Sequence, residues 1–187
     1  MRLIMTRQMA GVRILAGAIC GILISVVPDV SLAGAERQRK PSLAQNEVRE
    51  LDRIGLKAFD AVVAKDISGL LKLIDPNGIR WGADGVKSYA EIEEDLRSGK
   101  GPLFCRLFGC VNSTMTPVRA YFLQVKRSHL KITVRQTFEE FASLGMKYVR
   151  VSYSWPGVPQ SFIDSYDSLE FRWEESRGWL CESLFED

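Results

Sequence analysis

Residues 169–185 read LEFRWEESRGWLCESLF and carry the strongest β-hairpin pattern of the chain. Apolar and polar residues alternate on both sides of a short polar turn, which is typical of strands that have one buried face. A register that keeps the aromatic side chains on one face pairs Trp173 with Trp179 and Phe171 with Cys181. The stretch therefore predicts two antiparallel strands at the end of the fold, with one apolar face.

The same register decides where the charged residues of the hairpin lie. It sets Glu170 opposite Glu182 and places Arg172 diagonal to Glu182, where a cation relieves the repulsion between two carboxylates. Such a pair could hold one carboxylate with a raised pKa for acid–base chemistry, or it could be a solvated ion cluster on the outer face. We favour the second interpretation, because the aromatic face should turn toward the helices. Leu180 and Leu184 then face outward too and suit a contact between two copies of the chain.

The rest of the chain divides into a helical part followed by a strand-rich part. Residues 131–138 and 148–155 alternate in the same way as the final hairpin and are predicted as strands. Residues 43–65 instead repeat apolar side chains at steps of three and four, which predicts a long helix. Helices first and an antiparallel meander afterwards indicate an α+β fold, in which N-terminal helices pack on one face of a curved antiparallel sheet.

Capping signals place several short elements between these two parts. Asp66 is a helix N-cap, and Ser88 with Glu91 forms an S-x-x-E capping box. Pro117 suits the start of a further helix. The expected short elements are a helix over residues 68–74, a strand over residues 79–81, a helix over residues 88–96 and a helix that begins at residue 116.

With these elements in place, the chain resembles the nuclear transport factor 2-like group, a cone-shaped α+β fold shared with ketosteroid-isomerase-like and SnoaL-like proteins. The resemblance rests on an opening helix that leads into residues 61–81, AVVAKDISGLLKLIDPNGIRW, and on the closing hairpin of residues 169–185. It implies a cone that covers nearly all of the chain after the leader. It implies no particular activity, because this fold hosts enzymes, binders and assembly modules alike. None of the pocket Asp, His or Tyr residues of the family's enzymes can be matched to this sequence.

Five aromatic residues on the predicted inner face form the candidate ligand-binding set: Tyr153, Trp155, Phe171, Trp173 and Trp179. They could line a pocket between the sheet and the helices, of the kind that holds a small apolar ligand. Aromatic stripes at strand spacing also occur as plain core, so the pattern leaves both interpretations open.

The N-terminal segment predicts export. Residues 1–35 combine three arginines, an uncharged run of 14 residues at positions 14–27, and a small-x-small motif that ends at Ala35. This is the order of a signal peptide that is cleaved after Ala35. The run is shorter than the roughly 20 residues that span a bilayer, so no membrane span is expected after cleavage. Residues 36–42 form a short flexible lead-in to a single domain over residues 43–187, which is expected in the periplasm or secreted.

The charge of the chain depends on this leader. The sequence holds 25 Lys and Arg against 23 Asp and Glu, and the leader contains three Arg and one Asp, so 22 groups of each sign remain. A protein that neutralises many phosphates needs a basic surplus. We therefore expect no nucleic acid partner.

Three cysteines remain after cleavage, namely Cys105, Cys110 and Cys181. An oxidising compartment permits a disulfide, and the spacing of Cys105 and Cys110 suits a small closed loop, with a bridge from either residue to Cys181 as the alternative. In the first case Cys181 is expected to be a buried, inert thiol. A zinc site is not expected, because the spacing is loose and no histidine lies nearby.

Two classes of function remain. No phosphate loop, HExxH or G-x-S-x-G motif is present, and the sole histidine, His129, lies in a basic, turn-like segment. We therefore predict no catalytic residues, no metal and no cofactor, and favour an exported binding or assembly module. Such a module would bind a small apolar ligand or an envelope protein, and the chain could also form a homodimer. The alternative is a small cofactor-independent hydrolase or isomerase that uses carboxylates in the cone cavity.

Overall fold

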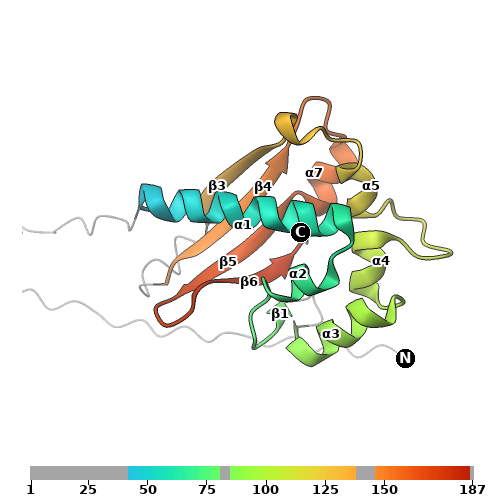
Figure 1. Cartoon of the computed structure of the whole chain (residues 1–187), viewed down its shortest axis with the longest axis horizontal. Coiled ribbons are helices and arrows are strands. Elements are labelled where there is room, and N and C mark those ends of the chain that lie inside the picture. Colours follow the sequence, from blue (N-terminus) through green and yellow to red (C-terminus); the bar gives the residue numbers. More distant parts are fainter. Residues whose placement is uncertain (1–41, 81–84, 138–145, 186–187) are drawn as a thin grey trace, which may run out of the picture. The chain divides into compact units, whose positions relative to one another are not determined.

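A four-stranded antiparallel sheet in the order β3-β4-β5-β6 is the centre of the fold (Figure 1). The computed structural model describes residues 42–80, 85–137 and 146–185. The strands are β3 (Lys131–Thr137), β4 (Tyr148–Ser154), β5 (Ser168–Glu174) and β6 (Gly178–Leu184). The predicted α+β class, with a meander in the last third, is confirmed. The leader, residues 36–41 of the lead-in, Trp81 and Phe138 lie outside the described residues.

The helices precede or connect the strands. They are α1 (Gln45–Ala64), α2 (Ile67–Leu71), α3 (Tyr89–Ser98), α4 (Pro102–Phe108), α5 (Val118–Phe122), the 3-10 turn η2 (Arg127–His129) and α7 (Gln160–Tyr166). A separate small hairpin consists of β1 (Ile79–Arg80) and β2 (Val86–Lys87). The sequence did not predict α4 and α7, because a helix of two turns is too short for its period to stand out. The capping predictions for Asp66 and Ser88 are confirmed, since each side chain accepts a hydrogen bond from a backbone amide three residues later.

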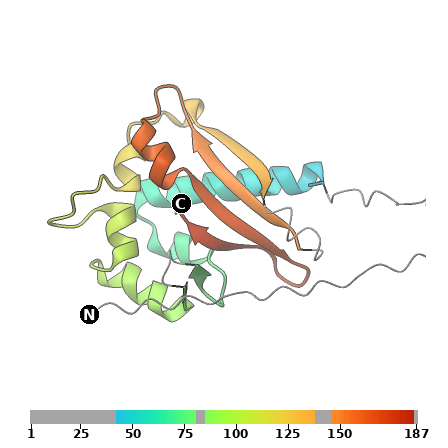
Figure 2. The same ribbon diagram turned by 180° about the vertical axis from the view of Figure 1, so that it is seen from behind.

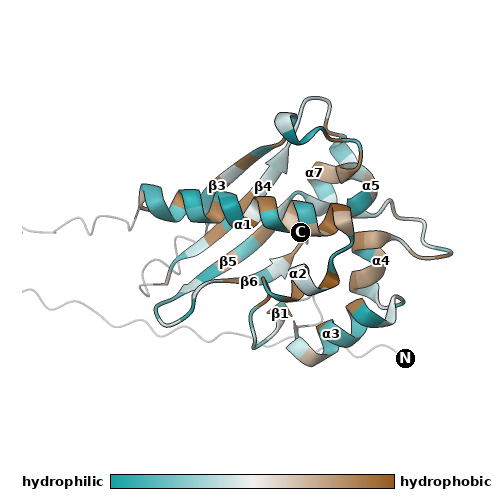
Figure 3. Cartoon of the chain, in the orientation of Figure 1, coloured by the Kyte–Doolittle hydropathy of each residue, from teal (hydrophilic) through white to brown (hydrophobic). Residues whose placement is uncertain are grey.

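Helix α1 lies across the inner face of the sheet, against β3 and β4 (Figure 2). Its hydrophobic and hydrophilic residues alternate in bands along the helix (Figure 3). Gly55 lies at the crossing, where an added Cβ would lie 2.9 Å from Val151 and 3.2 Å from Ile132. The missing side chain therefore allows the helix to approach the sheet closely. This contact identifies the helix-covered face of the sheet as the face that carries Val151.

The final hairpin follows the predicted aromatic pairing but contains a bulge. Trp173 pairs with Trp179 and Phe171 with Cys181, as predicted. Beyond that point the register shifts, and Glu170 pairs with Ser183 instead of Glu182. The prediction of two carboxylates directly opposite each other is therefore wrong. An extra residue on one strand changes which side chains face each side, and period-2 alternation in the sequence does not reveal it.

The bulge also changes the orientation of one of the two leucines that were predicted to face outward. Leu184 pairs with Leu169 and is fully buried, so it belongs to the core. Leu180 is 9% exposed. The predicted outward placement of Leu184 is therefore wrong, whereas Leu180 pairs with Arg172 on the outer face. Both leucines are buried within this chain, and a contact between two copies stays a prediction.

The far edge of β6 is covered by the segment that follows α2. Ile74 forms a parallel bridge with Cys181, and the amide of Asp75 donates to the carbonyl of Cys181 at 3.0 Å. The amide of Cys181 in turn donates to the carbonyl of Leu73 at 3.2 Å. This segment thus extends the sheet beyond β6 and leads directly into β1.

The core lies between the inner face of the sheet and the helices, within one compact unit over residues 38–187. Phe122 of α5 is 1% exposed and occupies its centre. The ring of Phe122 contacts aromatic rings from α1, β4, the β4–α7 connection, α7 and the end of β6: Phe59, Tyr153, Trp155, Phe162 and Phe185. Phe122 therefore packs against residues from both helices and strands of the fold.

Candidate functional site

The five aromatic residues of the predicted ligand set lie on the inner side of the sheet. Tyr153, Phe171 and Trp179 are buried, while Trp155 and Trp173 are partly buried and pack against the core. The Tyr153 hydroxyl donates to the carbonyl of Gly55 at 2.9 Å, and burial raises the pKa of Tyr153 well above its usual value. Two cavities described below are lined by other residues. These aromatics therefore make core contacts, and their role in ligand binding stays a prediction.

One polar group of this set has no hydrogen-bond partner in the part of the chain that the structure describes. Trp179 Nε1 is buried and unpaired, and its ring lies edge-on to Trp173 at 5.1 Å between centroids. Lys147 lies 6.0 Å from the Trp173 ring and donates to Glu47 at 2.6 Å. Burial raises the pKa of Glu47, but hydrogen bonds from Lys147 and the Ala44 amide outweigh it, so the net shift is downward.

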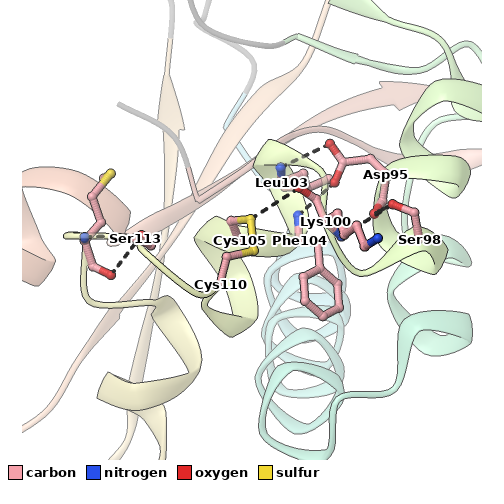
Figure 4. Close-up of a disulfide and its surroundings, with 9 residues drawn as sticks. Asp95, Ser98, Lys100, Leu103, Phe104, Cys105, Cys110 and Ser113 are labelled. Carbon is pink, nitrogen blue, oxygen red and sulfur yellow. Dashed lines mark hydrogen bonds between the residues drawn. A yellow bond between two sulfur atoms is a disulfide. The ribbon is translucent and has the colours of Figure 1, made fainter.

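The predicted disulfide is confirmed: Cys105 and Cys110 are bonded, with their Cα atoms 4.9 Å apart (Figure 4). The bond joins α4 to the second residue after its end. The other end of α4 is held by Asp95, whose carboxylate accepts hydrogen bonds from the amides of Leu103 at 3.1 Å and Phe104 at 2.9 Å. The disulfide and the carboxylate therefore fix both ends of a helix that would be unstable alone.

The structure places the remaining cysteine where the sequence predicted it. Cys181 is fully buried on β6, and burial raises the pKa of its thiol. A buried thiol of this kind is inert, because the reactive species is the thiolate.

These cysteine states predict a labelling order. Without reductant, iodoacetamide should modify none of the three cysteines in the folded protein. After mild reduction Cys105 and Cys110 should react, whereas Cys181 should react only after unfolding. Replacing Cys105 and Cys110 with serine should cost about 2 kcal/mol of unfolding free energy by loop-closure entropy. Mass mapping that found Cys105 alkylated before reduction would contradict the bond.

The charged residues of the final hairpin lie on the face opposite the helices and form an arginine–carboxylate network. It comprises equal numbers of guanidinium groups and carboxylates: Asp75, Arg80, Arg150, Glu170, Arg172, Glu174, Arg177 and Glu182. Glu170 is 7% exposed and accepts hydrogen bonds from Arg80 and Arg150. The predicted outward placement of these residues is correct, although the network is more buried than a solvated ion cluster.

Arg172 binds several carboxylates of this network. Its Nη2 donates to Asp75 Oδ2 at 2.8 Å, and its Nε donates to Glu182. The hydrogen bond to Glu182 raises the pKa of Arg172. Burial, and then the charge of Glu182, raise the pKa of Tyr148. A small cavity of about 180 Å³ lies beside Asp75, Arg172 and Glu182. Because arginines engage these carboxylates, the arrangement suits structural pairing more than proton transfer from a substrate.

A larger cavity of about 430 Å³ forms a groove between α1 and α2. We call it the α1–α2 groove, and its lining residues are Lys57, Asp60, Ala61, Ala64, Asp66, Gly69, Lys72 and Leu73. Asp60 pairs with Arg127 at 3.0 Å, and Asp66 caps α2 through the Gly69 amide. Neither Lys57 nor Lys72 has a hydrogen-bond or ion-pair partner within the described ranges. The groove thus combines a floor of small and apolar residues with two free ammonium groups.

This groove was missed by sequence reasoning. Its α1 residues recur at helical steps, but the residues that complete it come from another helix. The helix spacing could have indicated a stripe on α1, whereas the packing of α2 against that stripe is a tertiary feature.

Among the described residues, no group of three or more His, Cys, Asp or Glu side chains could hold a metal ion. In the same part of the chain, no helix combines the length and apolar character needed to cross a membrane. His129 lies in η2 and is exposed.

Comparison with known proteins adds no assignment. The chain matches no protein-family model, and the searches of curated proteins and of solved structures returned no significant match.

Proposed function

We propose that this chain is an exported, non-enzymatic binding module with a nuclear transport factor 2-like cone fold. In this proposal the ligand is a small apolar molecule that carries an anionic group, and it occupies the α1–α2 groove. The aromatic face of the sheet then serves mainly as the core that holds the groove walls in place.

The observation that carries the proposal is the pair of free lysines over an apolar floor. Lys57 and Lys72 line the same cavity, whereas both acidic residues of the groove are already engaged by Arg127 or by a helix cap. Ligand sites combine apolar lining with a few polar groups that fix orientation. An ammonium group attracts an anion, and the apolar floor of Ala61, Ala64 and Leu73 favours a hydrocarbon body.

Two further observations support the wider proposal. Disulfides form in oxidising compartments, so the bond between Cys105 and Cys110 agrees with the export predicted from residues 1–35. The element order supports the cone fold, since α1, α2 and β1 precede a four-stranded antiparallel meander.

The alternative, a cofactor-independent hydrolase or isomerase, receives less support. It needs carboxylates inside the cone, but Glu170 and Glu182 lie on the face opposite the helices and accept hydrogen bonds from arginines.

The groove predicts binding of an amphipathic anion. The fluorescent probe 8-anilinonaphthalene-1-sulfonate has an apolar body and one sulfonate, and we expect it to bind the folded protein. Replacing both Lys57 and Lys72 with glutamine should weaken its affinity roughly tenfold, because both lysines are exposed and each contributes up to about 1 kcal/mol at such a site. Fluorescence titration at two salt concentrations measures the effect, which should shrink at high salt.

Two variants control this experiment. Lys100→Gln removes an exposed lysine outside the groove and should leave the affinity unchanged. Trp173→Ala tests the aromatic face. If Trp173→Ala weakens the probe while the double lysine variant does not, the ligand site lies on the aromatic face and the groove assignment is wrong.

A further inference from the structure

Strand β3 is the open edge of the sheet. β4 covers one side of β3, and no other described element pairs with its second side, whereas the opposite edge of the sheet is covered by residues 73–75 (Figure 2). In an edge strand, alternate residues direct their amide and carbonyl groups away from the sheet. β3 therefore presents a seven-residue template that an extended chain could join.

The outer face of this edge carries positive charge. Lys131 and Arg135 are exposed and lie four positions apart on the strand, so they share one face. Lys126, just before the strand, is exposed as well. Within the described residues none of these three cations has a carboxylate partner, while the neighbouring Arg127 pairs with Asp60.

Arg135 is in an unfavourable position within the sheet. It lies directly opposite Arg150 on β4, and Arg150 is paired with Glu170 on the next strand. Like charges that face each other across two strands are destabilising, and no carboxylate among the described residues pairs with Arg135. A carboxylate beside Arg135 would relieve this repulsion.

The other face of β3 is apolar and incompletely covered. Ile132 and Val134 point toward the core side but are only partly buried. An added strand could extend this apolar face with its own alternate side chains. A strand that pairs with this edge would therefore be favoured if its residues alternate between acidic side chains on the outer face and apolar side chains on the inner face.

We infer that the free edge of β3 binds an extended acidic polypeptide segment, which adds a fifth strand to the sheet. The same cations oppose pairing with a second copy of β3. An antiparallel self-pair centred on Val134 would gather Lys131 and Arg135 of both copies on one face without any carboxylate. The edge charges therefore select against self-association and for a partner of opposite sign. This surface is separate from the α1–α2 groove, so the inference goes beyond the proposed function.

The test uses capped seven-residue peptides. A peptide of alternating Glu and Val should bind the full protein, and amides of β3 should become more protected from hydrogen exchange. The matching Lys and Val peptide should bind at least tenfold more weakly. Two further Glu and Val peptides carry N-methyl groups on alternate residues, one on the odd and the other on the even positions. The peptide whose methyl groups face β3 cannot complete the hydrogen-bond ladder and should lose at least tenfold in affinity.

The protein variant Arg135→Glu sharpens the test. It places a carboxylate opposite Arg150, so the variant should be at least as stable as the natural protein, yet it should bind the acidic peptide about tenfold more weakly. Lys100→Glu makes the same charge change on an exposed residue away from β3 and should bind normally. Equal binding by the N-methylated peptides would show charge attraction alone and overturn the inference. Concentration-dependent protection of β3 without any peptide would indicate self-pairing and overturn it too.

Discussion

Replacing Phe122 with alanine is expected to lower the free energy of unfolding by about 3–5 kcal/mol. The residue is 1% exposed, and its ring lies 4.7 Å from Phe59 and 5.3 Å from Tyr153. Truncation removes apolar burial and leaves a cavity between the helices and the sheet. Because the rings around it come from separate elements, the site cannot collapse easily, and the loss should fall in the upper half of this range. Urea unfolding followed by tryptophan fluorescence measures it.

The neighbouring residue provides a matched control. Leu123 is 56% exposed, so Leu123→Ala should change the unfolding free energy by less than about 0.5 kcal/mol. Phe122→Leu keeps part of the volume and should lie between the two. If Phe122→Ala costs no more than Leu123→Ala, the aromatic side chains do not form one packed core, and an open ligand pocket on the sheet becomes the better interpretation.

Replacing Asp75 with alanine is expected to cost about 3 kcal/mol or more. Its side chain is 2% exposed and accepts hydrogen bonds from Arg172 at 2.8 Å and from the Asn77 amide at 2.8 Å. Removal leaves a partly buried guanidinium donor and a backbone amide without this acceptor. It also loosens the segment that pairs with β6, since the Asp75 amide bonds to the Cys181 carbonyl. Thermal and urea unfolding of the variant measure the loss.

Two variants separate the causes of this effect. Asp75→Asn keeps an oxygen for the Asn77 amide but removes the charge that faces Arg172, so it should recover part of the loss. Glu174→Ala removes a carboxylate from the exposed side of the same network and should have a much smaller effect. An Asp75→Ala variant that unfolds at the urea concentration of the natural protein would show that the network adds no stability.

Residue types alone do not determine which side chains line a ligand-binding surface in this protein. Five aromatics at strand spacing left a pocket and a plain core both open, and the ring centroids of Trp155 and Phe162, 4.8 Å apart, show that one of the five packs on a neighbouring ring. The two free lysines belong to α1 and to the residue after α2, and nothing in their separation along the chain links them.

Local patterns did predict the elements whose signals are local. Asp66 and Ser88 cap helices because their side chains reach amides three residues away, an interaction that neighbouring residues define. The pairing of Trp173 with Trp179 followed from a turn of a few residues and one apolar face. The short spacing of Cys105 and Cys110 favoured the bond that the structure contains. In each case the partners lie within a few residues, so the chain between them restricts the geometry.

Features that depend on distant partners were not predictable in this way. The bulge at the end of the hairpin turns Leu184 inward, and period-2 alternation carries no signal of it. The partner of Asp75 is Arg172, nearly a hundred positions later in the chain, and their contact depends on how the segment after α2 meets β6.

The sequence by itself determined the α+β class of the fold, the long first helix, the closing antiparallel strands and the aromatic pairing of the last hairpin, and it favoured the small disulfide loop. Each of these depends on hydrophobic period or on contacts between near neighbours. Only the tertiary structure decided which surfaces are free for a partner. The α1–α2 groove and the open edge of β3 arise because distant segments pack on some faces and leave others uncovered, and that depends on the whole chain.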